Sequence, residues 1–356
     1  MLQHGTRILG LGRYFWDAIR EINPNDVRAE LERQVTIGFF GRPGSGRHTL
    51  SRALFGDGEQ DVPVRRFSFN EADSAAVAAA GAIDLAFLLL DAREPDWSAE
   101  RRVGGQLAGR GCPTLLILTH ADALTSPQQG LPAMRLQFPS HPPELMAVVD
   151  PRNVQATRAR LIGLVLNTVP ALRLALAHQY PALRRAVSDD LIREASRVNA
   201  QFALMSSLPA LIPVLGMFLG GVADILVLTK NQAMLVFKLA ALYGRDVSDR
   251  MGVLREIAPV IGGAFLWRTA ARTAVGLAPA PISALPKAAI AYFGTYSVGQ
   301  AARYYYERGD KPPPEVMREF QAEARRRYES LNDLLKQRFA GPRTALPPAP
   351  PREGTA

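Results

Sequence analysis

Cysteine is almost absent from this 356-residue sequence, which contains a single one, Cys112. A single thiol excludes an internal disulfide framework and a zinc site made of four cysteines. Such low cysteine usage is typical of a reducing compartment and predicts a cytoplasmic protein, on the cytoplasmic face of the membrane if it binds one. The composition also excludes disorder of the whole chain, because 47% of the residues are hydrophobic and only 21% are charged.

Lysine is missing from the first 229 residues, and the positive charge is concentrated in the later part of the chain. Of the net charge of +9, residues 1–149 contribute −2, residues 150–310 contribute +8 and residues 311–356 contribute +3. A basic excess favours an anionic partner, either nucleic acid or anionic lipid. The first region has no basic patch interleaved with aromatic residues, so no nucleic-acid partner is predicted. The basic middle region is the most apolar, which favours membrane lipid as the partner.

Charged residues are also missing from long stretches of the second half. None occurs in residues 198–223, 273–286 or 288–302. No strand pattern is present after about residue 170, so this half predicts an all-α apolar helical domain. Residues 208–228 approach the ~20 apolar residues that a membrane-spanning helix needs, with Asp224 as their only charge. A buried helical hairpin inside a soluble bundle explains the same pattern.

Five short apolar runs in the first half predict buried β-strands. They are residues 35–40, 62–69, 83–91, 114–119 and 145–150. Strands that are apolar along nearly their whole length have both faces buried, which is typical of a mostly parallel sheet covered by helices. Residues 97–109 and 153–168 can supply such helices. Residues 123–144 are rich in Pro, Gln and Ser and predict an irregular loop.

These patterns divide the chain into five segments. They are an N-terminal helical segment (1–33), an α/β domain (34–168), an apolar helical domain (169–310), an amphipathic helix (311–340) and a Pro-rich tail (341–356) that is expected to be disordered. In the first segment, Asn23 is the predicted cap of a short helix that begins near Pro24. The stripe of apolar residues in 314–339 predicts a helix that packs on the body of the protein.

A glycine-rich segment follows the first predicted strand and precedes a predicted helix. It reads Gly41-Arg42-Pro43-Gly44-Ser45-Gly46-Arg47-His48, which is the spacing of a phosphate-binding loop. Glycines let backbone N–H groups turn toward a phosphate, and the helix N-terminus adds positive potential. Arg47 stands in place of the lysine that reaches the β- and γ-phosphates. His48 stands in place of the hydroxyl that binds Mg²⁺, a cation that prefers oxygen ligands, and Thr49 follows one position too late.

The loop therefore has two interpretations: it binds an anion or nucleotide, or it keeps only the geometry of the turn. Its candidate nucleotide-binding residues are Gly41, Gly44, Ser45, Gly46, Arg47, His48 and Thr49. No catalytic residue is predicted. No metal site is predicted either, because His48 and His120 are too few ligands for zinc and both are expected to be solvated loop histidines. Asp91, at the end of a strand, is interpreted as an ordinary structural residue.

The run IGFFGRPGSGRHTLSRALFG resembles the first strand, phosphate loop and first helix of Era-like GTPases, a branch of the translation-factor-related GTPases. AIDLAFLLLDAREPD is similar to the strand after that family's switch II region. LLILTHADAL is similar to the strand that carries its guanine-specificity motif, Asn-Lys-x-Asp, which reads Thr119-His120-Ala121-Asp122 here. The resemblance implies a P-loop NTPase domain of the G-domain type. It adds Thr119, His120 and Asp122 to the candidate nucleotide-binding residues, with Asp122 available to the guanine base.

Other elements of that family are altered. No Asp-x-x-Gly occurs in the first domain, and Asn70-Glu71-Ala72-Asp73 stands where it is expected. Only 21 residues separate His48 from Asn70, which leaves little room for switch I. Phosphoryl transfer depends on the lysine, the metal and a placed water. The resemblance thus implies a pseudo-GTPase that binds GTP or GDP weakly or not at all, with a doubtful need for Mg²⁺ and little or no catalysis.

Residues 175–310 are similar to a helical domain of unknown function that often follows Era-like GTPase domains in proteins described as membrane-associated. The markers of this resemblance are Asp224, Gln232, Met234 and the Ala-Leu-Tyr-Gly at 241–244. It implies that the protein acts at a membrane surface, as a peripheral or integral protein. Two alternatives stay open. One is a nucleotide-independent scaffold for an unknown protein partner, with a soluble helical bundle, and the other is an active GTP-binding protein with atypical motifs.

Overall fold

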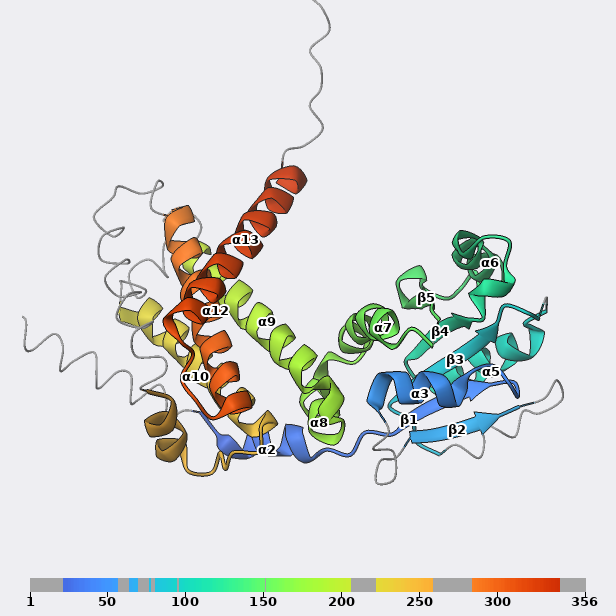
Figure 1. Cartoon of the computed structure of the whole chain (residues 1–356), viewed down its shortest axis with the longest axis horizontal. Helices are drawn as coiled ribbons and strands as arrows, with labels where there is room; N and C mark the ends of the chain where they lie inside the picture. Colours follow the sequence, from blue (N-terminus) through green and yellow to red (C-terminus); the bar gives the residue numbers. More distant parts are fainter. Residues whose placement is uncertain are drawn as a thin grey trace, which may run out of the picture.

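The computed structural model describes residues 22–56, 64–69, 77, 81–94, 96–150, 152–205, 222–258 and 284–339. Figure 1 shows an α/β domain at one end of the long axis and a helical region at the other. Several predictions fall outside the described residues. They concern the first 21 residues, most of the uncharged runs 198–223 and 273–286, and the Pro-rich tail.

Five parallel strands form one sheet in the order β2-β1-β3-β4-β5. The strands are β1 (Ile37–Gly41), β2 (Val64–Ser68), β3 (Leu85–Asp91), β4 (Thr114–Thr119) and β5 (Met146–Val148). β1, β3 and β4 are buried along their whole length, as their apolar runs predict. The predicted parallel α/β domain is confirmed. In the register of β3 and β4, Asp91 lies opposite Thr119, so both residues end at the edge of the sheet where the glycine-rich loop leaves β1.

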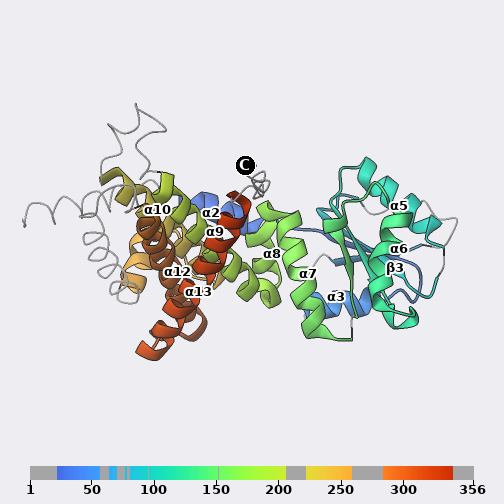
Figure 2. The same cartoon turned by 90° about the horizontal axis from the view of Figure 1, so that it is seen from above.

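Helices cover both faces of this sheet. They are α3 (Arg47–Phe55), α5 (Ser98–Gly109), α6 (Gly130–Gln137) and α7 (Val154–Thr168). α3 and α7 pack on the face that carries Phe39 and Phe87, whereas α5 and α6 pack on the face that carries Leu88 and Leu118 (Figure 2). The glycine-rich loop between β1 and α3 lies at the carboxyl edge of the sheet, which is the edge where ligands bind in open parallel sheets.

The structure corrects the prediction of an irregular loop over residues 123–144, because α6 lies within it. Gly130 opens this helix so close to the sheet that an added Cβ would lie 2.7 Å from Cδ2 of Leu118. Met134 is fully buried, and Leu131 packs partly buried against the same apolar cluster. A short helix with few apolar positions, flanked by Pro and Gln, gives no clear helical period in the sequence.

After α7 the described residues form α-helices joined by short 3₁₀ helices and turns, with no strand among them, so the predicted all-α region is confirmed there. Its helices are α2 (Pro24–Glu32), α8 (Arg173–Gln179), α9 (Arg184–Met205), α10 (Val222–Leu242), α12 (Ala284–Arg308) and α13 (Pro314–Phe339), with a further helical stretch at 250–258. α12 packs against α9, α10 and α13. The side chain of Asn23 caps α2 by accepting from the backbone N–H of Asn25 at 3.1 Å, as predicted.

The amphipathic helix predicted over 314–339 is present with those bounds, as α13, and it packs on α12. Ala324 is fully buried in this contact. The ring of Tyr328 lies 5.7 Å from that of Tyr292 and 5.4 Å from that of Phe293, measured between centroids. The part of the apolar stripe that contains Ala324 and Tyr328 therefore packs against α12.

One apolar core runs from the sheet into the helical region. At the junction, the side chain of Gln179 at the end of α8 accepts from the backbone N–H of Val35 at 3.0 Å and donates to its carbonyl at 2.8 Å. The ring of Tyr180 lies 4.3 Å from that of Phe55, the last residue of α3. The helix that begins at the glycine-rich loop therefore ends against the helical region.

In the part of the chain that the structure describes, no single helix combines the length and hydropathy that crossing a bilayer requires. α7 and the segment Pro170–Gln179 meet these criteria only together, across a bend of 101°. Leu161 and Val165 of α7 belong to the core beneath the sheet. The candidate span at 208–228 lies mostly outside the described residues and stays a prediction.

Candidate functional site

The glycine-rich loop connects β1 to α3 and curls over the carboxyl edge of the sheet. Gly44 and Gly46 have φ angles of 82° and 90°, a left-handed conformation that L-residues rarely adopt. A Cβ at Gly41 would collide with Oγ of Ser45. Gly46 caps α3, and its carbonyl accepts from the N–H of Leu50 at 2.8 Å. The three glycines are thus required by the shape of the loop, and the N-terminus of α3 lies at its end.

Thr119 holds this loop from below. Its side chain is fully buried at the end of β4, and its hydroxyl lies 2.9 Å from the carbonyl of Ser45 and 3.2 Å from the carbonyl of Leu90. Ser45 is itself buried. The hydroxyl of Thr119 is therefore engaged with the protein backbone.

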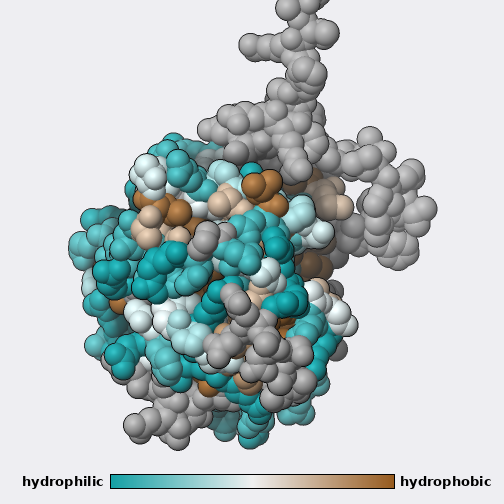
Figure 3. Space-filling view, turned by 90° about the vertical axis from the view of Figure 1, so that its right-hand side faces the viewer, coloured by the Kyte–Doolittle hydropathy of each residue, from teal (hydrophilic) through white to brown (hydrophobic). Residues whose placement is uncertain are grey.

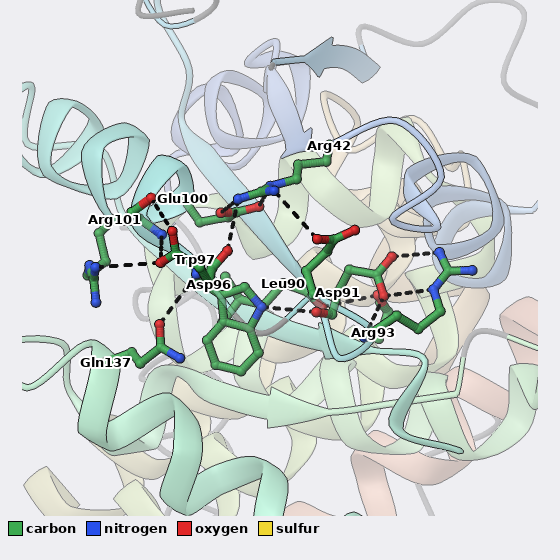
Figure 4. A network of polar contacts seen from close by, with 12 residues as sticks. Arg42, Leu90, Asp91, Arg93, Asp96, Trp97, Glu100, Arg101 and Gln137 are labelled. Carbon is green, nitrogen blue, oxygen red and sulfur yellow. Dashed lines mark hydrogen bonds and ion pairs between the residues drawn. The ribbon is translucent and has the colours of Figure 1, made fainter. Parts of the chain in front are cut away.

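Arg42 ties the loop to α5 through a buried ion pair (Figure 4). Its Nε lies 2.8 Å from Oε1 of Glu100, and its Nη2 lies 3.3 Å from Oε2. The same Nη2 donates to the carbonyl of Asp96 at 2.9 Å. Only 1% of the Glu100 side chain is exposed. A bidentate pair buried to this degree fixes the position of the loop relative to α5.

Arg93 ties the loop to the end of β3 (Figure 4). Its Nε and Nη2 donate to the two carboxylate oxygens of Asp91 at 2.9 and 2.6 Å, and its backbone N–H donates to the same carboxylate at 3.0 Å. Nη2 also donates to the carbonyl of Gly44 at 3.1 Å. Sequence reasoning missed this role of Arg93. Its position two residues after a strand-terminal Asp was the available signal.

Asp91 is a carboxylate that the protein already neutralises. Only 6% of its side chain is exposed. Burial by itself raises the pKa of Asp91, but the hydrogen bonds from Arg93 and the nearby charge of His120 outweigh it, so the pKa lies below its usual value. The described residues contain no group of three or more His, Cys, Asp or Glu side chains placed to hold a metal ion.

Arg47 is the first residue of α3 and is partly buried. Burial, followed by the positive charge of Arg66, lowers the pKa of Arg47. Arg66 lies on β2, and its Nε donates to Oγ of Ser51 in α3 at 3.2 Å, so two positive charges lie along this helix. His48 and Thr49 are exposed on the first turn. The solvated position predicted for His48 is confirmed.

The residues that resemble a guanine-specificity motif, Thr119 to Asp122, differ in placement. His120 has a left-handed φ of 53°, and its Nδ1 lies 3.4 Å from Oδ1 of Asp91. Only 24% of its side chain is exposed, so the expectation of a solvated loop histidine is wrong for His120, which the left-handed backbone turns toward the carboxylate. The side chain of Asp122 is 70% exposed. Its Oδ2 lies 3.3 Å from Nη2 of Arg152, a residue of the loop that follows β5.

The structure thus brings the residues of 41–49 together with Thr119 and His120 at one edge of the sheet, and it leaves Asp122 exposed in a short 3₁₀ turn. The fold and this edge define a class: a parallel α/β domain with a glycine-rich strand-to-helix loop, followed by a helical region. Comparison with models of known protein families and with curated proteins found no match.

Proposed function

We propose that the α/β domain is a phosphate-binding module without GTPase activity, which takes GTP or GDP weakly and without Mg²⁺. The observation that carries this proposal is the loop of residues 41–46, which has the left-handed glycines and the helix N-terminus that suit a phosphate. Thr119, Arg42 and Arg93 support this loop from three sides. A loop fixed before it meets its ligand loses little entropy on binding.

The absence of catalysis follows from the groups near the loop. A metal-dependent phosphoryl transfer needs an oxygen ligand for Mg²⁺. His48 offers an imidazole, and the carboxylate of Asp91 is engaged by Arg93. Arg47 supplies charge, but its planar fork is wider than the ammonium of a lysine and does not replace it at the phosphates.

A nucleotide-independent scaffold is the second candidate. Arg93 favours it, because this side chain pairs with Asp91 and donates to the carbonyl of Gly44, which holds the loop in place without a ligand. On the face of the α/β domain in Figure 3, apolar side chains form separate patches on a mostly hydrophilic surface. That face offers no broad apolar surface of the kind that marks stable protein interfaces. A scaffold function would therefore use a polar interface there.

Action at a membrane surface is the second part of the proposal, and it rests on the sequence. The support is the charge of +8 on residues 150–310 together with the uncharged run at 198–223. The protein is expected in the membrane fraction of cells that express the full chain. Release by carbonate indicates peripheral attachment, and resistance to carbonate indicates integration. Recovery of the whole protein in the soluble fraction contradicts this part.

Titration of the full chain with fluorescent GTP, GDP and ATP tests the nucleotide part, with Mg²⁺ and with a chelator. The expected dissociation constants for GTP and GDP are above about 100 µM and do not change with the chelator. The double substitution Arg47→Lys with His48→Ser is expected to strengthen binding and make it depend on Mg²⁺. Arg52→Lys, on the exposed side of the same helix, is the matched control.

Three results separate the alternatives. Micromolar GTP binding that the chelator abolishes indicates an active GTP-binding protein and contradicts the proposal. No binding by the wild type and no gain from the double substitution indicates a scaffold. Weak binding with a gain only in the double variant supports a phosphate-binding loop.

A further inference from the structure

A basic groove lies in the helical region, far from the glycine-rich loop. α9 and α13 both pack on α12, which forms the floor between them (Figures 1 and 2). The groove has a volume of about 350 Å³. It is lined chiefly by Arg193, Arg197, Tyr292, Glu323, Arg326 and Arg327. This volume suits a small molecule, because ligand sites begin at roughly 300 Å³.

Positive charge dominates the lining, with four guanidinium groups against one carboxylate. Glu323 is shared by two of them: it lies 2.7 Å from Nη2 of Arg326 and 2.6 Å from Nε of Arg327. Arg193 lies 3.4 Å from Asp190, which is closer to Arg173, at 2.6 Å. The groove therefore holds more positive charge than its own acidic groups neutralise.

Arg197 is the most available cation of the groove. It is exposed on α9, and it forms no ion pair within the described part of the chain. Arg326 is also 68% exposed, although it shares Glu323. Arg197 therefore has no ion pair to give up among the described residues, and an ion pair as exposed as that of Arg326 contributes little to stability, so both guanidinium groups can contact a ligand at low cost.

Tyr292 supplies a hydroxyl at the floor. Its ring is buried, 6.1 Å from the ring of Tyr296 by centroids. Burial raises the pKa of Tyr292, and the positive charges of Arg327, Arg197 and Arg193 oppose this rise. Guanidinium groups from both walls thus lie close enough to act on one phenol, which remains a neutral hydrogen-bond donor at pH 7.

We infer that this groove binds a compact anion that carries phosphate, such as a diphosphate or a phosphate ester. One guanidinium group can donate two parallel N–H bonds to the oxygens of a phosphate. Because α9 and α13 both contribute arginines to the groove, several guanidinium groups can contact one ligand. Arg197 and Arg326 contact the phosphate, and Tyr292 donates a hydrogen bond to it. The inference goes beyond the proposed function of the glycine-rich loop and does not depend on it.

Glu323 gives the site a distinctive property. It competes with the ligand for Arg326 and Arg327, because the same guanidinium donors serve both. Removal of its charge raises the net charge of the lining and frees these donors. Glu323→Gln is therefore expected to strengthen binding, which a substitution that merely damages the fold would not do.

Calorimetric titration of the full chain with inorganic diphosphate tests the inference. Arg197→Gln and Arg326→Gln are each expected to weaken binding about fivefold or more, and Glu323→Gln to strengthen it about threefold. The matched control is Arg325→Gln, because Arg325 is 75% exposed on α13 and pairs with Glu329 away from the groove. Thermal unfolding of every variant is compared with the wild type.

A second arm separates the two sources of phosphate. Sedimentation with vesicles of phosphatidylcholine, with and without phosphatidylglycerol, is measured for the same variants. Sensitivity of vesicle binding alone to Arg197→Gln identifies a lipid headgroup, and sensitivity of diphosphate binding identifies a soluble ligand. Either result supports the site.

Two results overturn the inference. One is that neither probe responds to Arg197→Gln or Arg326→Gln more than to Arg325→Gln. The other is that diphosphate binding is lost in Arg47→Gln and unchanged in the groove variants. That second result assigns the anion to the glycine-rich loop, so it refutes the groove and leaves the proposed function standing.

Discussion

The candidate nucleotide site has a phosphate half, the glycine-rich loop of residues 41–46, and a base half, the turn that carries Asp122. The two halves differ in how deeply the protein buries the ion pairs around them. Around the phosphate half, the pairs of Arg42 with Glu100 and of Arg93 with Asp91 each contain a carboxylate that is almost fully buried. Around the base half, the pair of Asp122 with Arg152 is exposed, by 70% and 69% of the side chains.

This difference shows which half depends on a ligand for its shape. Breaking a buried ion pair strands a charge in a poorly solvated place, whereas an exposed pair exchanges its partner for water at little cost. The phosphate half therefore keeps its conformation when empty. The ion pair at the base half is exposed to solvent, so the position of Asp122 is held only weakly.

The largest effect is expected from Glu100→Gln. The substitution leaves Arg42 mostly buried without its main counter-charge, which costs about 3 kcal/mol of unfolding free energy. Urea unfolding measures the loss. Glu94→Gln is the matched control, since Glu94 lies 3.7 Å from the same guanidinium but is half exposed, and its loss costs under about 0.5 kcal/mol. Equal effects of the two substitutions would break the comparison.

Asp91→Asn is expected to cost about 2 kcal/mol at pH 7, because the carboxylate accepts charge-assisted hydrogen bonds from Arg93. The pKa of Asp91 is lower in the folded than in the unfolded protein. Its contribution is therefore complete above its ordinary pKa of 3.8 and is lost as the pH falls through the lower, folded-state value. The gap between wild type and variant in urea unfolding should narrow at acidic pH. A gap independent of pH would refute this assignment.

Thr119→Val is expected to cost about 1 kcal/mol, because the buried carbonyl of Ser45 loses its donor. Thr114→Val is the matched control at the other end of β4, where the hydroxyl donates to the carbonyl of Cys112 at 3.0 Å. Both variants should lose similar stability. Only Thr119→Val should speed amide hydrogen exchange in residues 44–47, and faster exchange there in both variants would contradict a specific support of the loop.

The smallest effect is expected at the base half. A double-mutant cycle of Asp122→Ala and Arg152→Ala should give a coupling energy below about 0.5 kcal/mol, which 1 M salt removes. Thermal and urea unfolding measure each corner of the cycle. A coupling above about 1 kcal/mol would mean that the base half is held as firmly as the phosphate half.

The sequence by itself determined most of the elements that the structure describes, with α6 as the exception. β4 and α13 have the bounds that their apolar patterns predict, at Thr114–Thr119 and Pro314–Phe339. The position of the glycine-rich loop between a strand and a helix was equally readable. These features can be predicted because they depend only on residues that are near one another in the chain. The spacing of apolar residues indicates a strand or a helix, and glycine permits the left-handed conformation that the loop needs.

The tertiary structure alone decided which side chains support the loop. Arg42 pairs with a residue 58 positions away, and Arg93 donates to a carbonyl 49 residues away; at the junction with the helical region, Gln179 bonds to Val35, which precedes β1 and lies 144 residues earlier. Nothing in residue type selects these partners, because each arginine has many acidic residues available. The strand order β2-β1-β3-β4-β5 places the ends of β1, β3 and β4 side by side, and the carboxylates of Asp91 and Glu100 near these ends are buried, so each needs a charged partner.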